Sequence, residues 1–393
     1  MVNFIERLNF RKRNERESKF FDYTLLFVVI FLIGFGLLMI YSASSYEANL
    51  AFGDAGYYLK RQFIASVIGF IGMIAVTFVP YKFWEKIPLS VYYIVPCVLL
   101  LLLLVPGVGV SSHNATRWIK LVGGFNLQPA EVAKVAMIFF YAKLLKDRAY
   151  LTKSWKGLGV LFIMPIIVVL EIYGISDNLS SAVIVYGIVI CMMFVVSYDW
   201  KKFAIVGGGL GAFIAIVIFA ILKFASADSS SFRFRRIFAW VHPEDYADGI
   251  GFQTLQALYA VGSGGIFGKG LGESMQKLSY IPEAQNDMIY SIICEELGLV
   301  GGFAVMALFA IMLWRLLVIA NNTTDLYGAL LVVGVLAHFA IQVILNIAVV
   351  TNTVPNTGIS LPFISYGGSS IAFLLLEVGV ALSVAKGIKF NKD

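Results

Sequence analysis

The stretch IPLSVYYIVPCVLLLLLLVPGVGVSSHNAT, residues 87–116, contains no Asp, Glu, Lys or Arg. A run of about 20 apolar residues is long enough to cross the hydrocarbon core of a bilayer as a helix. Similar runs recur along the chain, which is 59% hydrophobic and only 14% charged, against roughly 25% charged in an ordinary soluble domain. Because the runs are continuous rather than alternating, the sequence predicts an all-α polytopic integral membrane protein and argues against a β-barrel.

About ten transmembrane helices are expected, and together they are predicted to form a single transmembrane domain over residues 22–388. A large extracytoplasmic loop, about residues 225–286, is expected between the seventh and eighth helices. The spans are predicted near residues 22–43, 62–80, 87–106, 129–146, 157–174, 179–197, 202–224, 287–316, 326–350 and 363–386.

Lysine and arginine are unevenly distributed over the predicted connections. Residues 1–21 form a basic arm, which indicates a cytoplasmic segment that faces anionic lipid rather than nucleic acid, since a span follows at once. With this arm inside, the inner connections hold clearly more Lys and Arg than the outer ones. This bias predicts that both termini, including a tail at 389–393, are cytoplasmic and that the long loop is outside. The three Cys and three His residues are scattered, so neither a disulfide framework nor a zinc site is expected.

The segment NATRWIKLVGGFNLQPAEVAKV, residues 114–135, is too polar for a simple connector. Pro129 can start a helix, since its missing N–H costs little at that position. Glu131 and Lys134 are spaced to form an ion pair on one face of this helix. The pair could lock two helices together, or it could form the polar floor of a cavity that also contacts substrate. Arg117 could bind a phosphate and Trp118 could stack on a sugar or lipid, although Trp118 could equally be an interfacial anchor.

The predicted outer loop holds two unusual stretches. FRFRRIFAW, residues 232–240, places Arg233 and two further arginines beside aromatics, which suits either anchoring to lipid headgroups or a pyrophosphate site. GFQTLQALYAVGSGGIFGKGLG, residues 251–272, predicts a short helix and then a glycine-rich turn. The turn is not a nucleotide-binding loop, because Lys269 is followed by Gly270 rather than Ser or Thr. Its glycines are expected to permit a re-entrant turn or close approach of the backbone to a ligand, and Lys269 is a candidate substrate-binding residue.

In IPEAQNDMIYSIICEELG, residues 281–298, a carboxylate marks the point where the polar loop meets an apolar helix. Asp287 is costly to desolvate at such a place, so it is a functional candidate; the alternative is an N-terminal helix charge that the macrodipole favours. Glu283 and Gln285 could add oxygen ligands for a hard divalent cation such as Mg²⁺ or Mn²⁺. Glu295 is expected to be a structural hydrogen-bonding group.

Proline and glycine interrupt the apolar pattern again in NTVPNTGISLPFISYGGSS, residues 352–370. Irregular backbone at membrane depth persists only where it lines a cavity or is buried in protein. Ser365, Tyr366, Ser369 and Ser370 offer hydroxyl groups there. The segment is therefore predicted to be a pocket wall.

These motifs together resemble the SEDS family, the membrane glycosyltransferases of bacterial cell-wall synthesis that include FtsW and RodA. The resemblance covers nearly all of the chain after the basic arm, and SMQKLSYIPEAQND (274–287) is more similar to the FtsW branch. It rests on QPAE (128–131), ALYAVGSGGIFGKGLG (257–272), IPEAQND with EELG (281–298) and PNTGISLPFISYGGSS (355–370).

The resemblance implies an inverting polymerase that joins lipid II units into glycan strands outside the cytoplasmic membrane, for septal synthesis in cell division. It assigns the family's essential aspartate to Asp287 and suggests that Arg117, Glu131 and Lys134 line one outer cavity, with Gln128 in the same motif. A class B penicillin-binding transpeptidase and other division membrane proteins are the implied partners, with no nucleotide and no nucleic acid. An elongation or sporulation role, a lipid II flippase and a division scaffold remain as alternatives.

The chemistry expected of such an enzyme is an attack by a sugar hydroxyl on an anomeric carbon as a polyprenyl pyrophosphate leaves. A positioned carboxylate can accept the hydroxyl proton, and cations can stabilise the leaving group. Asp287 is therefore expected to act as the base or as a ligand of an activating metal. The sequence leaves these two roles open.

Overall fold

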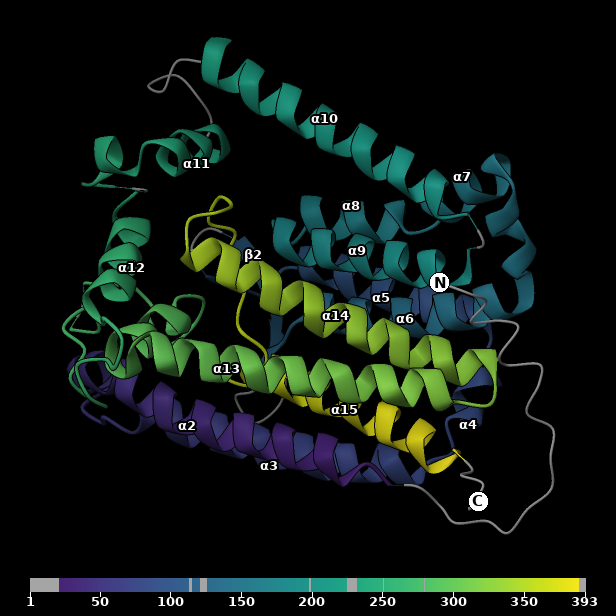
Figure 1. Ribbon diagram of the computed structural model, residues 1–393, viewed down its shortest axis with the longest axis horizontal. Coiled ribbons are helices and arrows are strands. Elements are labelled where there is room, and N and C mark those ends of the chain that lie inside the picture. The colour runs from purple at the N-terminus through teal and green to yellow at the C-terminus, as the bar shows by residue number, and fades with distance from the viewer. Residues whose placement is uncertain are drawn as a thin grey trace.

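The computed structural model describes residues 21–112, 115–120, 126–197, 199–224, 232–249, 251–278 and 280–388. Nearly all of the basic arm and the tail at 389–393 lie outside these residues. Long helices run side by side along the molecule, with the short helices 232–241 and 252–263 toward one end and the short helix 82–85 toward the other (Figure 1). The helices are α2 (Tyr23–Phe52), α3 (Tyr57–Phe78), α4 (Lys82–Glu85), α5 (Leu89–Leu101), α6 (Pro129–Arg148), α7 (Trp155–Ile163), α8 (Ile166–Gly174), α9 (Leu179–Val196), α10 (Trp200–Phe224), α11 (Phe232–Val241), α12 (Phe252–Ser263), α13 (Ile289–Asn322), α14 (Leu326–Val350) and α15 (Gly368–Lys386).

Every predicted span contains a helix, and the protein is a multi-pass membrane protein. Within the described residues, eight helices are long and apolar enough to cross a membrane, with α7 and α8 counted as one. The third predicted span is a shorter apolar helix, Leu89–Leu104. The fourth is α6, whose several charged side chains keep it out of the eight. The count of ten therefore remains a prediction.

A three-stranded antiparallel sheet departs from the all-α prediction. Its strands are β1 (Gly109–Ser112), β2 (Ala115–Lys120) and β3 (Asn126–Leu127), in the order β1-β2-β3. Val110 lies opposite Trp118, and Ile119 lies opposite Leu127. Strand β2, which carries Arg117 and Trp118, packs against α6.

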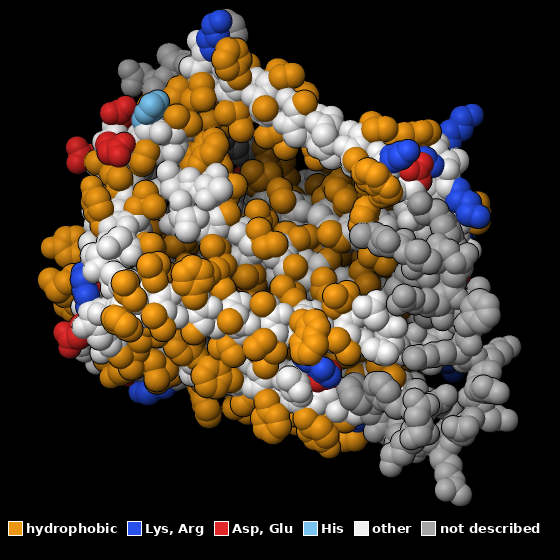
Figure 2. Space-filling model, viewed as in Figure 1, with side chains coloured by type: hydrophobic (Ala, Val, Ile, Leu, Met, Phe, Trp, Pro, Cys, Tyr) orange, Lys and Arg blue, Asp and Glu red, His pale blue; other side chains and the backbone are white. Residues whose placement is uncertain are grey.

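Contacts between helix ends show which elements share an end of the bundle. Arg315 near the end of α13 pairs with Asp22 before α2 at 2.7 Å, and Lys386 at the end of α15 lies 5.7 Å from the Phe21 ring. The short helices α11 and α12 lie at the opposite end (Figure 1). Hydrophobic side chains cover the visible sides of the bundle, as expected for a surface that faces lipid (Figure 2).

The glycine-rich turn after α12 packs tightly on α13. A Cβ atom on Gly264 would lie 2.0 Å from the Cys294 carbonyl oxygen, and one on Gly298, where φ is +67°, would lie 2.3 Å from the Ile266 carbonyl oxygen. The close approach expected of these glycines is thus made to the backbone of α13. Residues 264–278, together with the side chains they hold on α13, are called the clamp below.

Two buried carboxylates of α13 anchor the clamp. Glu295 pairs with Lys269 at 2.6 Å and also accepts hydrogen bonds from the Ser274 hydroxyl and the Met275 N–H. Lys277 pairs with Glu296 at 2.9 Å. The structural role expected of Glu295 is confirmed, and Lys269, predicted to bind substrate, lies in the clamp.

Candidate active site

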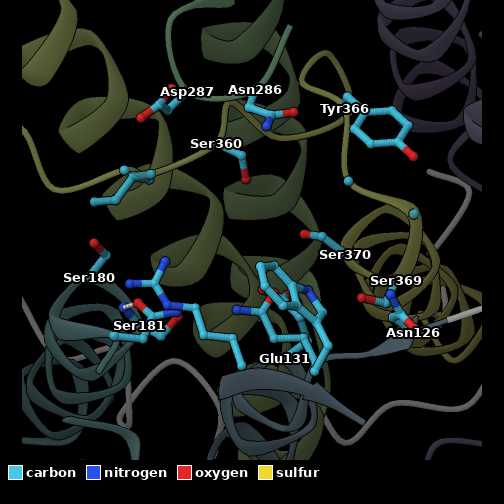
Figure 3. A pocket seen from close by; sticks show the side chains of 18 of the residues that line it. Asn126, Glu131, Ser180, Ser181, Asn286, Asp287, Ser360, Tyr366, Ser369 and Ser370 are labelled. Carbon is cyan, nitrogen blue, oxygen red and sulfur yellow. Dashed lines mark hydrogen bonds between the residues drawn. The ribbon is translucent and has the colours of Figure 1, made fainter. Parts of the chain in front are cut away.

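A cavity of about 710 Å³ opens between α3, β2, α6, α9 and the two irregular segments 283–287 and 358–370 (Figure 3). This volume is in the range of pockets that hold small-molecule ligands. Eleven of the side chains singled out from the sequence line it: Arg117, Trp118, Gln128, Glu131, Lys134, Glu283, Gln285, Asp287, Tyr366, Ser369 and Ser370. The cavity therefore joins segments that are far apart in the chain.

Among the described residues, Asp287 is held through its backbone rather than through an ion pair. The Asn346 side-chain amide on α14 donates to the Asp287 carbonyl oxygen at 2.8 Å and to the Ile359 carbonyl oxygen at 2.6 Å. The carboxylate itself has a long contact, 3.5 Å, with the Gln253 side-chain amide. Helix α13 begins at Ile289, two residues later than the start considered in the sequence analysis. The carboxylate therefore faces the cavity from the turn before the helix.

Burial raises the pKa of Asp287 to about 6. The N–H groups of Asp287 and Met288 and the Arg236 guanidinium oppose the rise, while the nearby Glu283 carboxylate adds to it. Such a carboxyl group is mostly ionised at neutral pH, yet it binds a proton more tightly than an ordinary aspartate does. A pKa near the working pH is what an efficient general base needs.

The predicted ion pair on α6 is confirmed and lies on the cavity floor. Lys134 Nζ is 2.8 Å from Glu131 Oε1, and both side chains are buried. Among the described residues, Glu131 Oε2, Gln342 Oε1 and Ser370 Oγ have no hydrogen-bond partner although they are buried at the cavity lining. Unpaired buried acceptors are costly. They suit a ligand that brings its own hydroxyl or amide donors.

Arginines line the cavity from two sides. Arg117 donates from Nη2 to the Asp177 carbonyl oxygen at 2.9 Å and from Nε to the Ser176 carbonyl oxygen at 3.2 Å, which fixes its guanidinium at the α8–α9 turn. Arg61 on α3 also lines the cavity, with its guanidinium 4.8 Å from the centre of the Tyr57 ring. Fixed guanidinium groups favour binding of phosphate oxygens.

The segment 352–370 forms a wall of the cavity, as predicted. The Tyr366 N–H donates to the Gln285 carbonyl oxygen at 2.8 Å, and Gln62 on α3 binds both sides of this turn, at the Gly367 N–H and the Ser365 carbonyl oxygen. The Ser365 hydroxyl is buried and accepts from the Leu361 N–H at 2.7 Å. It therefore stabilises the turn, whereas Tyr366 faces the cavity.

Several lining residues were missed from the sequence, and one predicted residue is not placed. Arg233 belongs to α11, but its side chain lies outside what the structure describes. The sequence does contain a signal for Gln342 and Asn346. They are polar residues four positions apart in an apolar helix, and such residues usually face the bundle interior. The missed lining residues include Tyr58, Arg61, Asn126, Asn178, Ser180, Ser181, Asn286, Gln342 and Ser360.

Glu283 and Asp287 form an acidic edge of the cavity, which is a candidate site for a divalent cation. No group of three or more His, Cys, Asp or Glu side chains that could hold a metal is found in the described part of the chain. Asp287 and Glu283 both line the cavity, and Glu283 also accepts from the Asn286 amide at 2.8 Å. One or two carboxylates suffice for Mg²⁺ when water and substrate phosphates complete its shell. The two carboxylates therefore fit such an ion, but not a site made by protein ligands alone.

Comparison with known proteins matches nearly the whole chain to one family. Residues 23–389 match a family model described as cell cycle protein, which unites FtsW, RodA and SpoVE. Stage V sporulation protein E of Bacillus subtilis is 38% identical over 374 residues, with 93% of this chain and 97% of the relative covered. The probable peptidoglycan glycosyltransferase FtsW of Trichlorobacter lovleyi is 37% identical, with 94% of each chain covered.

Two solved structures share the fold. A chain from a peptidoglycan synthase complex, described for the coordination of polymerization and crosslinking, has a TM-score of 0.75 at 24% identity and covers 93% of this chain and 97% of its own. RodA of Thermus thermophilus has a TM-score of 0.62 at 23% identity and covers 94% of this chain and 98% of its own. At these identities the structures support the fold alone.

Proposed function

Because this chain belongs to the FtsW, RodA and SpoVE family, we propose that it is a peptidoglycan glycosyltransferase that polymerises lipid II. The observation that carries the proposal is the position of Asp287, a carboxylate with a raised pKa and no ion-pair contact within 4.0 Å among the described residues, in a cavity lined by arginines and unpaired acceptors. A sugar nucleotide is not required, because lipid II carries its own diphosphate leaving group.

The proposed reaction is a single displacement at an anomeric carbon. The acceptor hydroxyl forms a bond to that carbon while the bond from the carbon to the diphosphate oxygen breaks, and the leaving electron pair stays on the diphosphate. Asp287 accepts the hydroxyl proton, a role worth roughly 10²–10⁴-fold in rate. Arg61 and Arg117 bind the diphosphate and so stabilise the charge that develops on it.

A divalent cation, Mg²⁺ or Mn²⁺, is proposed as a partner of the acidic edge. Asp287 and Glu283 would hold it, and when bound it would supply positive charge to the diphosphate. In that case Asp287 serves as ligand rather than base. Binding of Mn²⁺ to the purified protein can be followed by the electron paramagnetic resonance signal of the ion. If Glu283 and Asp287 hold the cation, Glu283→Gln should weaken this binding. A signal unchanged by that substitution would place the ion elsewhere.

The cellular setting is also proposed. The basic arm and the inner Lys and Arg residues support cytoplasmic termini, which would put Asp287 and α11–α12 outside the cytoplasmic membrane. The FtsW-named relatives favour a role at the division septum, with a class B penicillin-binding transpeptidase and other division membrane proteins as partners. The similarity to stage V sporulation protein E supports a sporulation role as an alternative, and the similarity to RodA supports an elongation role as another.

The decisive test is polymerisation of lipid II by the purified chain. Asp287→Asn should lose most of the activity, while Asp245→Asn, an exposed carboxylate of the same outer segment, should not. A flippase or a scaffold would instead show no glycan product from the wild-type chain. Equal product from wild type and Asp287→Asn would remove the catalytic proposal.

A further inference from the structure

A second, smaller cavity lies next to Gln253, whose side chain contacts the candidate base. It has a volume of about 230 Å³ and is enclosed by α11, α12 and the turns at Pro282 and Asn356. The proposed reaction does not use this second cavity. At this size it is below the range of roughly 300–1,000 Å³ of pockets for larger ligands, so it suits one ring rather than a lipid-linked disaccharide.

Gln253 connects the second cavity to Asp287. Its side-chain N–H group lies 3.5 Å from the Asp287 carboxylate and 3.2 Å from the Pro282 carbonyl oxygen, while its carbonyl oxygen accepts from the Asn356 amide at 3.0 Å. Asp287 lines the large cavity, and its neighbour Gln253 lines the small one. The candidate base therefore faces the large cavity and contacts a residue that lines the small one.

The lining of the second cavity differs from that of the first. Trp240 and Phe252 supply aromatic rings, and Gln253 and Asn356 supply neutral amides that both donate and accept hydrogen bonds. Arg236 is the cation in this lining. Aromatic faces, amides and little charge suit a sugar ring with hydroxyl and acetamido groups better than a diphosphate.

The aromatic wall is held in place by reciprocal hydrogen bonds. The Trp240 indole N–H donates to the Asn352 carbonyl oxygen at 3.0 Å, and the Asn352 side-chain amide donates to the Trp240 carbonyl oxygen at 3.2 Å. Asn352 belongs to the same segment as Asn356 and Gly358, which reaches Asp287. The ring is thus fixed relative to the candidate base.

We infer that the second cavity is a saccharide subsite, which binds one N-acetylated sugar ring of the glycan on the far side of the bond being formed. The inference rests on the proposed function, since a transfer between two sugars needs both of them near one base. The large cavity, with Arg61 and Arg117, then holds the substrate that bears the diphosphate. Gln253 lies where it can orient both the sugar and the Asp287 carboxylate.

The test uses the full chain in lipid nanodiscs and a soluble probe, β-1,4-linked N-acetylglucosamine tetrasaccharide, whose binding is followed by saturation-transfer NMR. Trp240→Ala should weaken binding about tenfold, as the loss of an aromatic contact predicts. Trp240→Phe, which keeps a ring but loses the N–H, should bind within about twofold of wild type by the same reasoning. Trp200→Ala, an exposed tryptophan on α10, is the matched control and should not change binding.

Three results would overturn the inference: no binding of the tetrasaccharide to wild type, equal binding by Trp240→Ala, or competition of the probe by inorganic pyrophosphate. Melting temperatures of the variants show whether a loss comes from unfolding, and Trp240→Phe keeps the test valid if Trp240→Ala does not fold. Asp287→Asn separates the two proposals, because it should abolish polymerisation while the tetrasaccharide still binds. If polymerisation depends on Asp287 but Trp240→Ala binds normally, the subsite alone is wrong.

Discussion

Asp287 and the clamp glutamates are carboxylates of one short stretch of chain, and their surroundings differ sharply. Glu295 and Glu296 are fully buried, each with a lysine within 3 Å and further hydroxyl or N–H donors. Asp287 has a side-chain amide at 3.5 Å, and burial raises its pKa. A carboxylate that holds structure together is surrounded by donors, whereas one that must accept a proton is left with few.

The largest expected effect concerns the acidic edge of the cavity. Asp287→Asn should lower the rate of polymerisation by about 10²–10⁴-fold, because the amide cannot accept a proton. The melting temperature should stay close to that of wild type, since no short ion pair is lost. If Asp287→Asn is inactive because it is unfolded, Asp287 has a structural role like that of the clamp glutamates, and the difference drawn between them does not hold.

Substitutions in the clamp should instead lower the stability of the protein. Lys277→Met leaves Glu296 buried without its cation, which should cost about 3–5 kcal/mol of stability. Thermal unfolding in detergent measures this loss. The matched control is the double variant Lys277→Met with Glu296→Gln, which removes the stranded charge and should recover most of the stability; no recovery would mean that the pair is not what holds the clamp.

Asn346 should affect catalysis through position. Asn346→Leu removes two hydrogen bonds to the Asp287 and Ile359 carbonyl oxygens, and a displacement of about 1 Å at a reacting group can cost around 100-fold in rate. We expect kcat to fall and KM to change little. Asn322→Leu, at the far end of α13, is the control, and a rise in KM without a fall in kcat would contradict a positioning role.

The smallest expected effect is on substrate binding by Arg61. Arg61→Met removes a cation that lines the cavity and is proposed to bind the diphosphate in both ground and transition states, so KM should rise by about tenfold with a smaller change in kcat. Its neighbour Lys60 is 68% exposed and pairs with Asp54. Lys60→Met should therefore change little, and equal effects of the two variants would argue against a phosphate site at Arg61.

Local sequence patterns predicted the helices and some of the cavity. The long apolar runs, Pro129 as the start of α6 and the spacing of Glu131 and Lys134 are short-range features, and all of them are present in the structure. Proline and glycine in 352–370 correctly indicated a wall, because irregular backbone needs cover at that depth.

Features that depend on distant partners could not be predicted in this way. The sheet at 109–127 requires a register between three short strands, and nothing in one strand alone specifies it. Arg61 and Lys269 look alike in sequence, as basic residues at the outer face. The fold turns Arg61 into the cavity and pairs Lys269 with Glu295, so their roles follow from packing rather than from residue type.

The dependence of the polymerisation rate on pH tests the central claim most directly. Because the pKa of Asp287 is raised to about 6, the carboxyl group gains its proton as the pH falls through this value and can then no longer act as a base. The account predicts that kcat/KM is level above pH about 7 and falls about tenfold per pH unit well below pH 6, and that the residual activity of Asp287→Asn lacks this step. A wild-type profile that is flat from pH 5 to 8, or the same step in Asp287→Asn, would contradict it.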